Sequence, residues 1–458
     1  MKLDSFLFEK YNTPTPRYTS YPPANYFKQL ENYDDVIKAI TNSNDEQPEN
    51  ISIYIHIPFC RQLCLYCGCN TKITRDRQSM KDYVDTIIKE INLLKPLLNH
   101  NRKISQIHWG GGTPNYLPVQ DVQKIMNHLK KNFNFTQNAE IAMECHPAHL
   151  TKEYVDELVQ LGFNRISFGI QDFSDKVLET VNREKSVLPI EEIISYIKSY
   201  KLLSLNLDFI NGLPYQTLKN FTKTIQKAVN LSPDRLAIFS YAHVPWIKKH
   251  QKSLEKFGLP TAKEKLEMFF SAYKILNDNN YTIIGLDHFA KPEDELSVAL
   301  NEKKLHRNFQ GYCTIETTGQ VYALGVSGIS QTTSSYLQNT KNIRLYTKHI
   351  KEGKLPVEKI YFVTEKEKII RHIIEEIMCN REVSLTDIAQ KHLISLEKLY
   401  QITQVDFNHL NEFEKEKLIT FKNNKISLTQ TGQFFMRNIA ASFDPNMKNN
   451  KKNFSKAL

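Results

Sequence analysis

The sequence predicts an α/β protein built around a parallel sheet, because stretches with strand and helix periodicity alternate along most of the chain. Six strand-then-helix units follow one another, and such units place their strands in parallel through right-handed crossovers. The chain has 458 residues, 41% of them hydrophobic, which is enough for one large domain and a smaller one. The six strands are expected at residues 51–59, 103–109, 139–145, 164–170, 203–210 and 235–241, and a seventh candidate lies at 281–287.

The first strand has the clearest pattern. In ISIYIHIPF the isoleucines at 51, 53, 55 and 57 alternate with Ser, Tyr and His, which is the period of two that a pleated strand requires. Helical stretches then separate the later strands. They are expected at residues 79–98, 119–132, 151–161, 174–201 and 216–230.

The two ends of the chain have a different character. Residues 1–36 are rich in Pro, Tyr and Asn without a clear period and are predicted to form an extended arm. The main domain is expected to span residues 37–360. From 361 to 458 the pattern changes to charged helices and a hairpin-like run, 417–440, which indicates a small, mainly helical domain that resembles a winged helix. A packing or lid role is favoured there over DNA binding, because no basic recognition helix stands out.

Polar or glycine-rich pieces directly follow the predicted strands. In α/β barrels the loops at the carboxyl ends of the strands build the active site, so these pieces are expected to converge on one face. In chain order they are CRQLCLYCGC, GGGTP, ECHP, GIQDF, NGLP and YAHVP.

Charge and hydropathy say more about where the protein is located than about what it binds. Lys and Arg number 60 against 50 Asp and Glu, and a net charge of +10 is compatible with an anionic substrate, with nucleic acid or with neither. Charges occur within the first ten residues, and no uncharged apolar run approaches the roughly 20 residues of a membrane span. We therefore expect a cytoplasmic protein without a membrane partner, in which clustered thiols are metal ligands or catalytic groups rather than disulfides.

Four of the seven cysteines, Cys60, Cys64, Cys67 and Cys69, fall within ten positions. A zinc site remains possible, but no distant second pair of ligands is visible. Three thiolates at CxxxCxxC spacing can instead bind three irons of a [4Fe–4S] cluster and leave the fourth iron open. Packing alone does not explain such a group, whereas the isolated cysteines are assigned to ordinary packing. These are Cys145, Cys313 and Cys379.

The CxxxCxxC loop after the first strand, with GGGTP after the second, resembles the radical S-adenosylmethionine (SAM) superfamily. This resemblance implies a [4Fe–4S] cluster whose open iron chelates SAM, and a 5′-deoxyadenosyl radical formed by SAM cleavage. It also implies the fold class: α/β, a partial (β/α)6 barrel with an N-terminal arm and a small C-terminal domain. Tyr66 could pack on adenine, and the glycines at 110–112 let backbone approach the SAM amino group.

Within that superfamily the chain is similar, over nearly its whole length, to the oxygen-independent coproporphyrinogen III oxidases (coproporphyrinogen dehydrogenases). The fourth cysteine, Cys69, is part of this likeness. The segments that carry the rest are PRYTSYP (16–22), YIHIPFC (54–60), HWGGGTP (108–114), GFNRISFGIQDF (162–173), NREK (182–185), NLDFINGLP (206–214), GLDHFA (285–290) and HRNFQGY (306–312).

The resemblance also implies site residues. The cluster ligands would be Cys60, Cys64 and Cys67. The cluster-bound SAM would contact Tyr54, Gly111, Glu144 and Ile329. A second SAM molecule would contact Tyr66, Gly112, Thr113, Gln171, Arg183, Asp208 and Ala242. No catalytic residue is assigned beyond the cluster and SAM.

The implied reaction converts two propionates of coproporphyrinogen III to vinyl groups, with loss of two CO₂, and gives protoporphyrinogen IX. The implied partners are a reductant such as flavodoxin or ferredoxin and an electron acceptor, with the protein a monomer that binds no nucleic acid. Buried carboxylates need cationic partners, for which Arg17, Arg307 and His306 are candidates.

Two other functions remain open from the sequence. Radical SAM proteins of similar sequence act as haem chaperones, although these relatives lack the fourth cysteine and the PRYTSYP arm, which are both present here. The other alternative is a zinc-containing nucleic-acid-binding protein that uses the basic charge and the winged C-terminal region.

Overall fold

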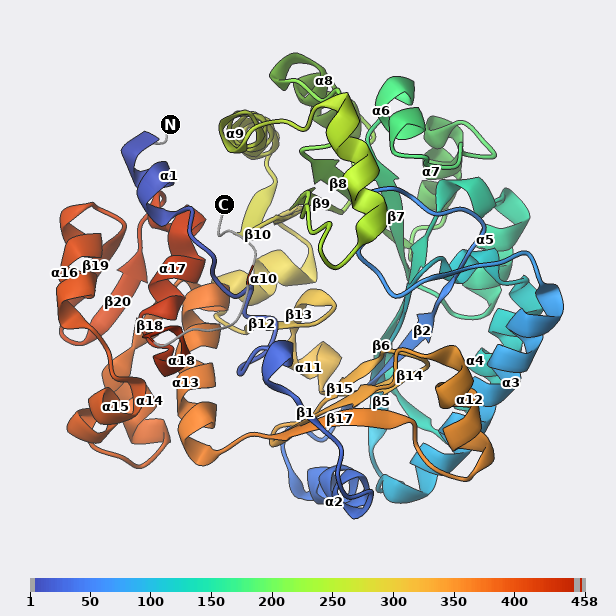
Figure 1. The fold of residues 1–458 in the computed structure, drawn as a ribbon, viewed down its shortest axis with the longest axis horizontal. Helices are drawn as coiled ribbons and strands as arrows, with labels where there is room; N and C mark the ends of the chain where they lie inside the picture. The colour runs from blue at the N-terminus through green and yellow to red at the C-terminus, as the bar shows by residue number, and fades with distance from the viewer. Residues whose placement is uncertain (1–4, 449–453, 455–458) are drawn as a thin grey trace.

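A computed structural model describes residues 5–448 and 454. Its centre is a sheet of 13 strands in the order β1-β17-β16-β15-β14-β2-β5-β6-β7-β8-β9-β11-β10 (Figure 1). The six predicted strands are all present, and neighbours along the chain pair in parallel. They are β2 (Ile51–Ile57), β5 (Lys103–Gly111), β6 (Asn134–Cys145), β7 (Arg165–Gln171), β8 (Ser204–Asn211) and β9 (Arg235–Ser240). The predicted α/β class is therefore confirmed, and the sheet stays open rather than closing into a barrel.

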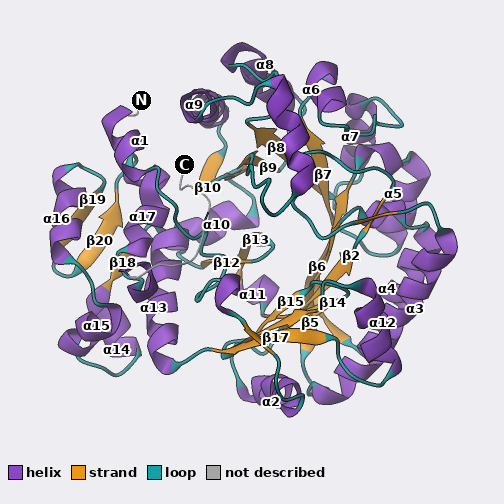
Figure 2. Ribbon diagram, in the orientation of Figure 1, coloured by secondary structure: helices purple, strands orange, loops and turns teal. Residues whose placement is uncertain are grey.

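Helices cover the outer side of the parallel strands (Figures 1 and 2). They are α3 (Arg77–Leu94), α4 (Val119–Asn132), α5 (Lys152–Gln160), α6 (Asp175–Thr180), α7 (Ile190–Ser199) and α8 (Leu218–Asn230). In α8, Phe221, Ile225 and Ala228 recur at helical spacing and are fully buried. The Thr217 side chain accepts a hydrogen bond from the Asn220 amide. This cap satisfies an amide of the first turn and favours the start of the helix there. Local capping and one apolar face thus explain α8.

Both ends of the parallel run are finished by antiparallel strands. The seventh candidate strand exists as β10 (Thr282–Gly285), but it pairs with β11 (His288–Ala290), which in turn pairs with β9. Two residues join β10 to β11, which is too short for a parallel crossover. At the other end β14 (Gln320–Leu324) is parallel to β2. The strands beyond it are antiparallel: β15 (Ile329–Gln331), β16 (Ser335–Asn339), β17 (Val357–Phe362) and β1 (Lys28–Gln29).

Further elements complete the main sheet and its inner side. The β12–β13 hairpin lies on the inner side of the curved sheet with α10 and α11 (Figure 1). These elements and the remaining helices are η6 (Lys249–Phe257), α9 (Ala262–Asp278), α10 (Glu295–Asn301), β12 (Leu305–Asn308), β13 (Gly311–Thr314), α11 (Ile315–Thr318) and α12 (Ile343–Lys351).

The N-terminal arm is not extended throughout, and that expectation is wrong for two stretches. Residues Ser5–Tyr11 form α1, and Asp34–Asn42 form α2. The aromatic rings of Tyr11, Tyr18 and Tyr21 are buried in a hydrophobic cluster with the C-terminal helices. A sequence rich in Pro and Tyr has no period of its own, so contacts with distant residues decide its path.

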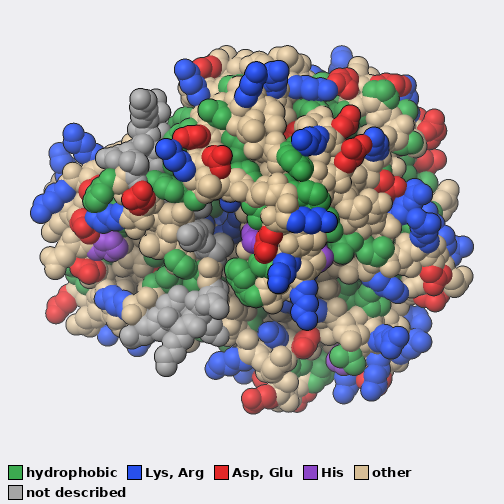
Figure 3. Space-filling view, turned by 45° about the horizontal axis from the view of Figure 1, so that its top comes forward, with side chains coloured by type: hydrophobic (Ala, Val, Ile, Leu, Met, Phe, Trp, Pro, Cys, Tyr) green, Lys and Arg blue, Asp and Glu red, His purple; other side chains and the backbone are tan. Residues whose placement is uncertain are grey.

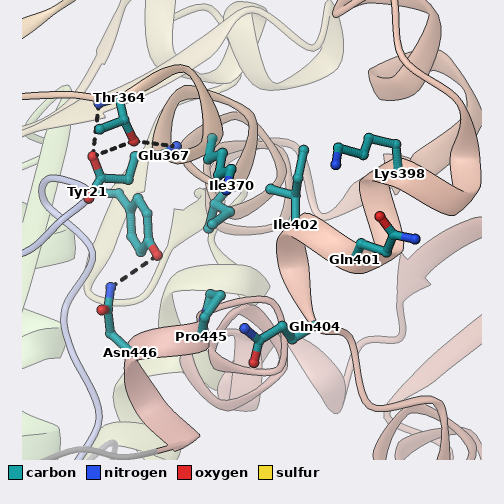
Figure 4. A pocket seen from close by; sticks show the side chains of 11 residues that line it. Tyr21, Thr364, Glu367, Ile370, Lys398, Gln401, Ile402, Gln404, Pro445 and Asn446 are labelled. Atoms are coloured by element: carbon teal, nitrogen blue, oxygen red, sulfur yellow. Dashed lines mark hydrogen bonds between the residues drawn. The ribbon is translucent and has the colours of Figure 1, made fainter.

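Hydrogen bonds fasten the arm to the end of the chain. The Tyr18 and Tyr21 hydroxyls donate to Asp444 at 3.1 and 2.9 Å, and Asn446 Nδ2 donates to the Tyr21 hydroxyl at 3.2 Å. Figure 4 shows Tyr21 and Asn446 together in a pocket that is also lined by Glu367 of α13 (Glu365–Glu375). The arm therefore runs between the sheet and the C-terminal region.

The C-terminal region combines helices with a small antiparallel sheet of order β18-β20-β19. Its hairpin, β19 (Ile419–Lys422) and β20 (Lys425–Leu428), lies inside the hairpin-like run predicted from the sequence. The other elements are β18 (Glu382–Ser384), α14 (Leu385–Lys391), α15 (Leu396–Thr403), α16 (Phe407–Lys415), α17 (Met436–Ala441) and α18 (Pro445–Lys448). The division at residues 36 and 360 stays a proposal, because β1 and α2 join the arm to the main sheet.

The isolated cysteines behave as expected: Cys145, Cys313 and Cys379 are all buried. Among residues 5–448 and 454, no helix is long and apolar enough to cross a membrane.

Candidate active site

The four clustered cysteines line one cavity at the carboxyl ends of the parallel strands. Cys60 lies in β3 (Phe59–Cys60), which pairs with β4 (Lys72–Ile73) and closes the base of the loop. Cys60, Cys64 and Cys67 are half-buried, whereas Cys69 is exposed. A hydrogen bond from Cys69 lowers the pKa of the Cys67 thiol to about 6, against the opposing effect of burial.

The segment after α6 holds this loop from one side. The Leu65 amide donates to the Val181 carbonyl at 2.9 Å, and Asn182 Nδ2 donates to the Leu63 carbonyl at 2.8 Å. Asn182 has a positive φ of 54°, a conformation that Asn tolerates better than most residues. The NREK segment at 182–185 therefore includes a residue that holds the cysteine loop in place.

A second segment, which the sequence interpretation missed, holds the loop from the other side. After β9, Lys248 Nζ donates to the Cys69 carbonyl at 2.7 Å, and Gln251 Nε2 donates to the Tyr66 carbonyl at 2.9 Å. Between them, His250 Nε2 lies 2.9 Å from the Cys67 carbonyl. Three long side chains thus contact three loop carbonyls and hold the backbone that carries the cysteines. The run KKHQ carries no periodicity that could have revealed this role.

The three glycines of GGGTP make room for the protein's own residues. A Cβ at Gly110 would lie 2.7 Å from Glu144 Oε1, and one at Gly112 would lie 2.7 Å from the Pro58 carbonyl oxygen and 3.0 Å from Cys60 Sγ. Gly111 has a φ of +114°, and its Cβ would meet the His56 ring at 2.7 Å. The close approach that these glycines permit is thus between neighbouring strand ends, and their contact with SAM remains a proposal.

Replacing Gly112 by Ala is expected to displace the cysteine loop, because the added methyl group would collide with rigid backbone at Pro58. We expect reconstituted Gly112→Ala to bind less than half as much iron per chain as the wild type, measured with a colorimetric iron assay. Gly68→Ala is the matched control, since a Cβ at Gly68 has nothing within 4 Å. Equal iron content in the Gly112 variant and the wild type would contradict this account.

Glu144 is a partly exposed carboxylate with donors on two sides. His108 Nε2 lies 3.0 Å from its Oε1, and the Gly111 amide donates to its Oε2 at 3.3 Å. Burial by itself would raise the pKa of Glu144, but the contacts with His108 and the Gly111 amide lower it by more. The pKa therefore lies below its usual value, and the carboxyl is ionised. The Tyr54 ring stacks on His108 with centroids 6.0 Å apart, which fixes the imidazole.

Arg183 and Asp208 line the opposite wall of the cavity. The Arg183 guanidinium donates to the Tyr66 hydroxyl at 2.8 Å and to the Gly169 carbonyl. Asp208 accepts from Ser167 Oγ and from Asn206 Nδ2, both at 2.7 Å, and burial raises its pKa. An acid inside an apolar strand thus has partners.

The parallel register brings these side chains to one level. It pairs Ile57 with Gly111, Glu144 with Ser167, and Gly169 with Asp208. Eleven of the residues proposed for the cluster and SAM line the cavity: Cys60, Cys64, Cys67, Tyr66, Gly111, Gly112, Thr113, Glu144, Gln171, Arg183 and Asp208. The expectation that the strand-end pieces converge holds for the first four of them. NGLP and YAHVP are not among the lining residues, and β8 contributes Asp208 from within the strand instead.

Three proposed residues lie outside the cavity lining. Tyr54 contacts His108, which in turn contacts Glu144. Ala242 follows β9 and is exposed, and Ile329 begins β15 beside a separate hydrophobic cluster. Cavity residues that the sequence interpretation did not propose are Gln62, Leu63, Cys69, Thr71, Cys145, His146, Ser167 and Gly169.

The donor set fits an iron–sulfur cluster. Soft thiolates on one short loop are the usual ligands of such clusters, and here three of them face a shared cavity with polar side chains opposite. Within the described part of the chain, no three His, Cys, Asp or Glu side chains surround a single metal-ion position. The fit to an iron–sulfur cluster therefore rests on the cysteine loop and its thiolate ligands.

Comparison with known proteins identifies the family of the chain. The radical SAM superfamily matches residues 54–228, from β2 to α8. The oxygen-independent coproporphyrinogen III oxidase of Synechocystis sp. is 37% identical over 455 residues, which cover 99% of this chain and 97% of that protein. The enzyme of that name from Escherichia coli K12 is 36% identical, over 96% of this chain and 95% of the relative.

A solved structure agrees over the same length. The coproporphyrinogen III oxidase of Escherichia coli, described as a radical SAM enzyme, superposes with a TM-score of 0.89 at 34% identity, over 97% of this chain and 99% of that one. The fold and the cysteine loop thus define a radical SAM enzyme. Within that class, the chain belongs to the family of oxygen-independent coproporphyrinogen III oxidases.

Proposed function

We propose that this enzyme catalyses the oxygen-independent oxidative decarboxylation of two propionates of coproporphyrinogen III to vinyl groups, which gives protoporphyrinogen IX in haem biosynthesis. The observation that carries the proposal is the Cys60–Cys64–Cys67 loop at the mouth of a cavity formed by strand ends. Relatives with this name, similar over the whole chain, support the choice of substrate.

The cofactors are a [4Fe–4S] cluster and SAM, held by the chain's own side chains. Cys60, Cys64 and Cys67 would hold the cluster, and the SAM contacts would be those named above from the family resemblance, including the second SAM molecule. When bound, the cluster and SAM supply a carbon radical that removes hydrogen from an unactivated propionate C–H bond, which acid–base chemistry does not do at pH 7.

The residues around the cavity bind and orient these groups. Glu144 is ionised and fixed by His108, so it suits a cationic ammonium group of SAM. Arg183, held by Tyr66 and Gly169, presents a half-buried cation that suits a carboxylate. The raised pKa of Asp208 makes it a hydrogen-bonding partner for a hydroxyl group rather than an isolated charge.

The reaction also needs electron partners. The reductant is a small electron-transfer protein such as flavodoxin or ferredoxin, and a separate acceptor takes the electron that each decarboxylated substrate radical releases. We further propose that the protein is a cytoplasmic monomer that binds neither nucleic acid nor membranes.

Isotope transfer tests this function. Reconstituted enzyme is incubated without oxygen with SAM, a reductant, a cell extract and coproporphyrinogen III that carries deuterium at the propionate β-carbons. We expect deuterium in the 5′-methyl group of deoxyadenosine, together with protoporphyrinogen IX, as measured by mass spectrometry. Reactions without reductant serve as the control. SAM consumption without deuterium transfer, combined with tight haem binding, would favour the haem-chaperone function instead.

A further inference from the structure

A lysine that no sequence motif singled out lies beside the proposed site. Lys265 stands on α9, and its Nζ donates to the carbonyl of Tyr241, directly after β9, at 3.1 Å. Asn211 Nδ2, at the end of β8, donates to the Lys265 carbonyl at 2.7 Å. The Lys265 stem lies over Gly212, where a Cβ would come within 2.8 Å of Lys265 Cδ. These contacts hold the ammonium group at the carboxyl edge of β8 and β9, the same edge that carries the cysteine cavity.

Two arginines from distant segments lie near this edge. Arg307, in the β12–β13 hairpin, is 5% exposed and donates through Nη1 to the Arg17 carbonyl. Its buried Nε has no hydrogen-bond partner within the described part of the chain. In the same hairpin, Gln310 Oε1 is also buried without a partner among the described residues. Native proteins leave few such atoms unsatisfied, so the unpaired Nε of Arg307 indicates a site for a polar ligand.

The neighbouring charges are mostly positive. Burial and the charge of Arg17 lower the pKa of Lys265 to about 8, and burial with the charges of Arg17 and Arg307 lowers the pKa of Arg437 to about 9. Arg17 is the neighbour that these cations share: Arg307 donates to its carbonyl, Arg437 Nε donates to the carbonyl of the preceding Pro16 at 3.1 Å, and its charge acts on Lys265. The carboxylate of Asp287 lies among them, 3.9 Å from Arg17, but it already accepts from His288 at 2.7 Å.

Lys265 itself has no acidic partner. No carboxylate of residues 5–448 or 454 lies within 4 Å of its ammonium group. Asp287 offsets part of this positive charge, and a bound anion would reduce the remaining repulsion between the cations. The strand register connects this region to the cavity wall, because Asp208 of β8 and His288 of β11 both pair with Ala237 of β9. Figure 3 shows basic side chains recessed in a hollow near the middle of the molecule.

We propose, on the basis of the proposed function, that Lys265, Arg17 and Arg307 bind a propionate carboxylate of the tetrapyrrole substrate beside the cysteine cavity. Arg17 and Arg307 were candidates from the sequence, and Lys265 completes the group. His306, the third sequence candidate, is separated from them: successive residues in a strand point to opposite sides, and His306 lies near Arg371 and Glu375 of α13.

The proposal is tested with coproporphyrin III, the oxidised and fluorescent form of the substrate, and with its tetramethyl ester. Reconstituted enzyme with SAM is titrated without oxygen, and binding is followed by fluorescence. Lys265→Met keeps the stem that packs on Gly212 and removes the charge. We expect it to raise the Kd for coproporphyrin III at least about tenfold, as loss of a charged hydrogen bond does. The Kd for the ester should be the same for both proteins.

Matched controls separate charge from folding. Lys263→Met removes an exposed charge two residues earlier on α9 and should leave both Kd values unchanged. Arg17→Gln changes a side chain that is 40% exposed, so it serves as a second test that does not endanger the fold. It should also weaken binding of the acid and not of the ester, whereas SAM cleavage without substrate should persist in Lys263→Met.

An equal Kd for coproporphyrin III in the wild type, Lys265→Met and Arg17→Gln would overturn the proposal. So would an equal loss of acid and ester binding, which would indicate a change of shape instead of a lost carboxylate contact. If the wild type failed to convert coproporphyrinogen III, the proposed function would be wrong, yet the difference between acid and ester binding would still decide whether this group binds carboxylates.

Discussion

Replacing Cys60, Cys64 or Cys67 by Ser, one at a time, is expected to remove the brown chromophore and to abolish SAM cleavage. A [4Fe–4S] cluster held by three thiolates has no spare ligand, and a serine hydroxyl is a poor substitute for a soft thiolate. The loss should exceed about 100-fold, which is the loss that even the residues supporting a metal ligand can cause. Iron and sulfide content, absorbance and deoxyadenosine formation are the measurements.

The chain supplies matched controls for this experiment. Cys69→Ser changes a thiol in the same loop that is exposed, and Cys313→Ala changes a buried thiol outside the cavity. Both are expected to retain about four irons per chain, the content of an intact cluster. If Cys69→Ser lost as much iron as Cys64→Ser, the assignment of three ligands and an open iron would be wrong.

Replacing Glu144 by Gln is expected to weaken SAM binding about 10-fold to 100-fold, the range that corresponds to a hydrogen bond between charged groups. Glutamine keeps the size of the side chain and one oxygen that can accept from His108, so the change isolates the negative charge. SAM affinity is measured by calorimetry on the reconstituted protein, and SAM cleavage is measured in parallel.

Unfolding experiments distinguish this effect from misfolding. The free energy of unfolding of Glu144→Gln should fall by only about 1 kcal/mol, because Gln keeps one oxygen that accepts from His108 but presents an NH2 group, which cannot accept, to the Gly111 amide. Glu153→Gln removes a carboxylate from the exposed face of α5 and should bind SAM normally. Normal SAM affinity in Glu144→Gln would show that Glu144 does not hold the cofactor.

Local patterns in the sequence determined the architecture of this protein. The period of two in Ile51–Ile57 and the helical spacing of Phe221, Ile225 and Ala228 depend only on neighbouring residues, so strands, helices and their order could be predicted. The cysteine loop and the glycines at 110–112 could also be recognised, because the residues that define each motif lie close together in the sequence. Parallel topology then brought them to one edge of the sheet.

Contacts between distant segments were decided only by the tertiary structure. The arm folds partly as α1 because Tyr11 packs on Phe413 and Phe435 of the C-terminal region, and β10 reverses onto β11 because a two-residue link cannot cross the sheet. Lys265 and Lys248 lie on unremarkable polar stretches, and their partners are the carbonyls of Tyr241 and Cys69. Such side chains show no period and no motif, since their role depends on which strand ends the fold brings beside them.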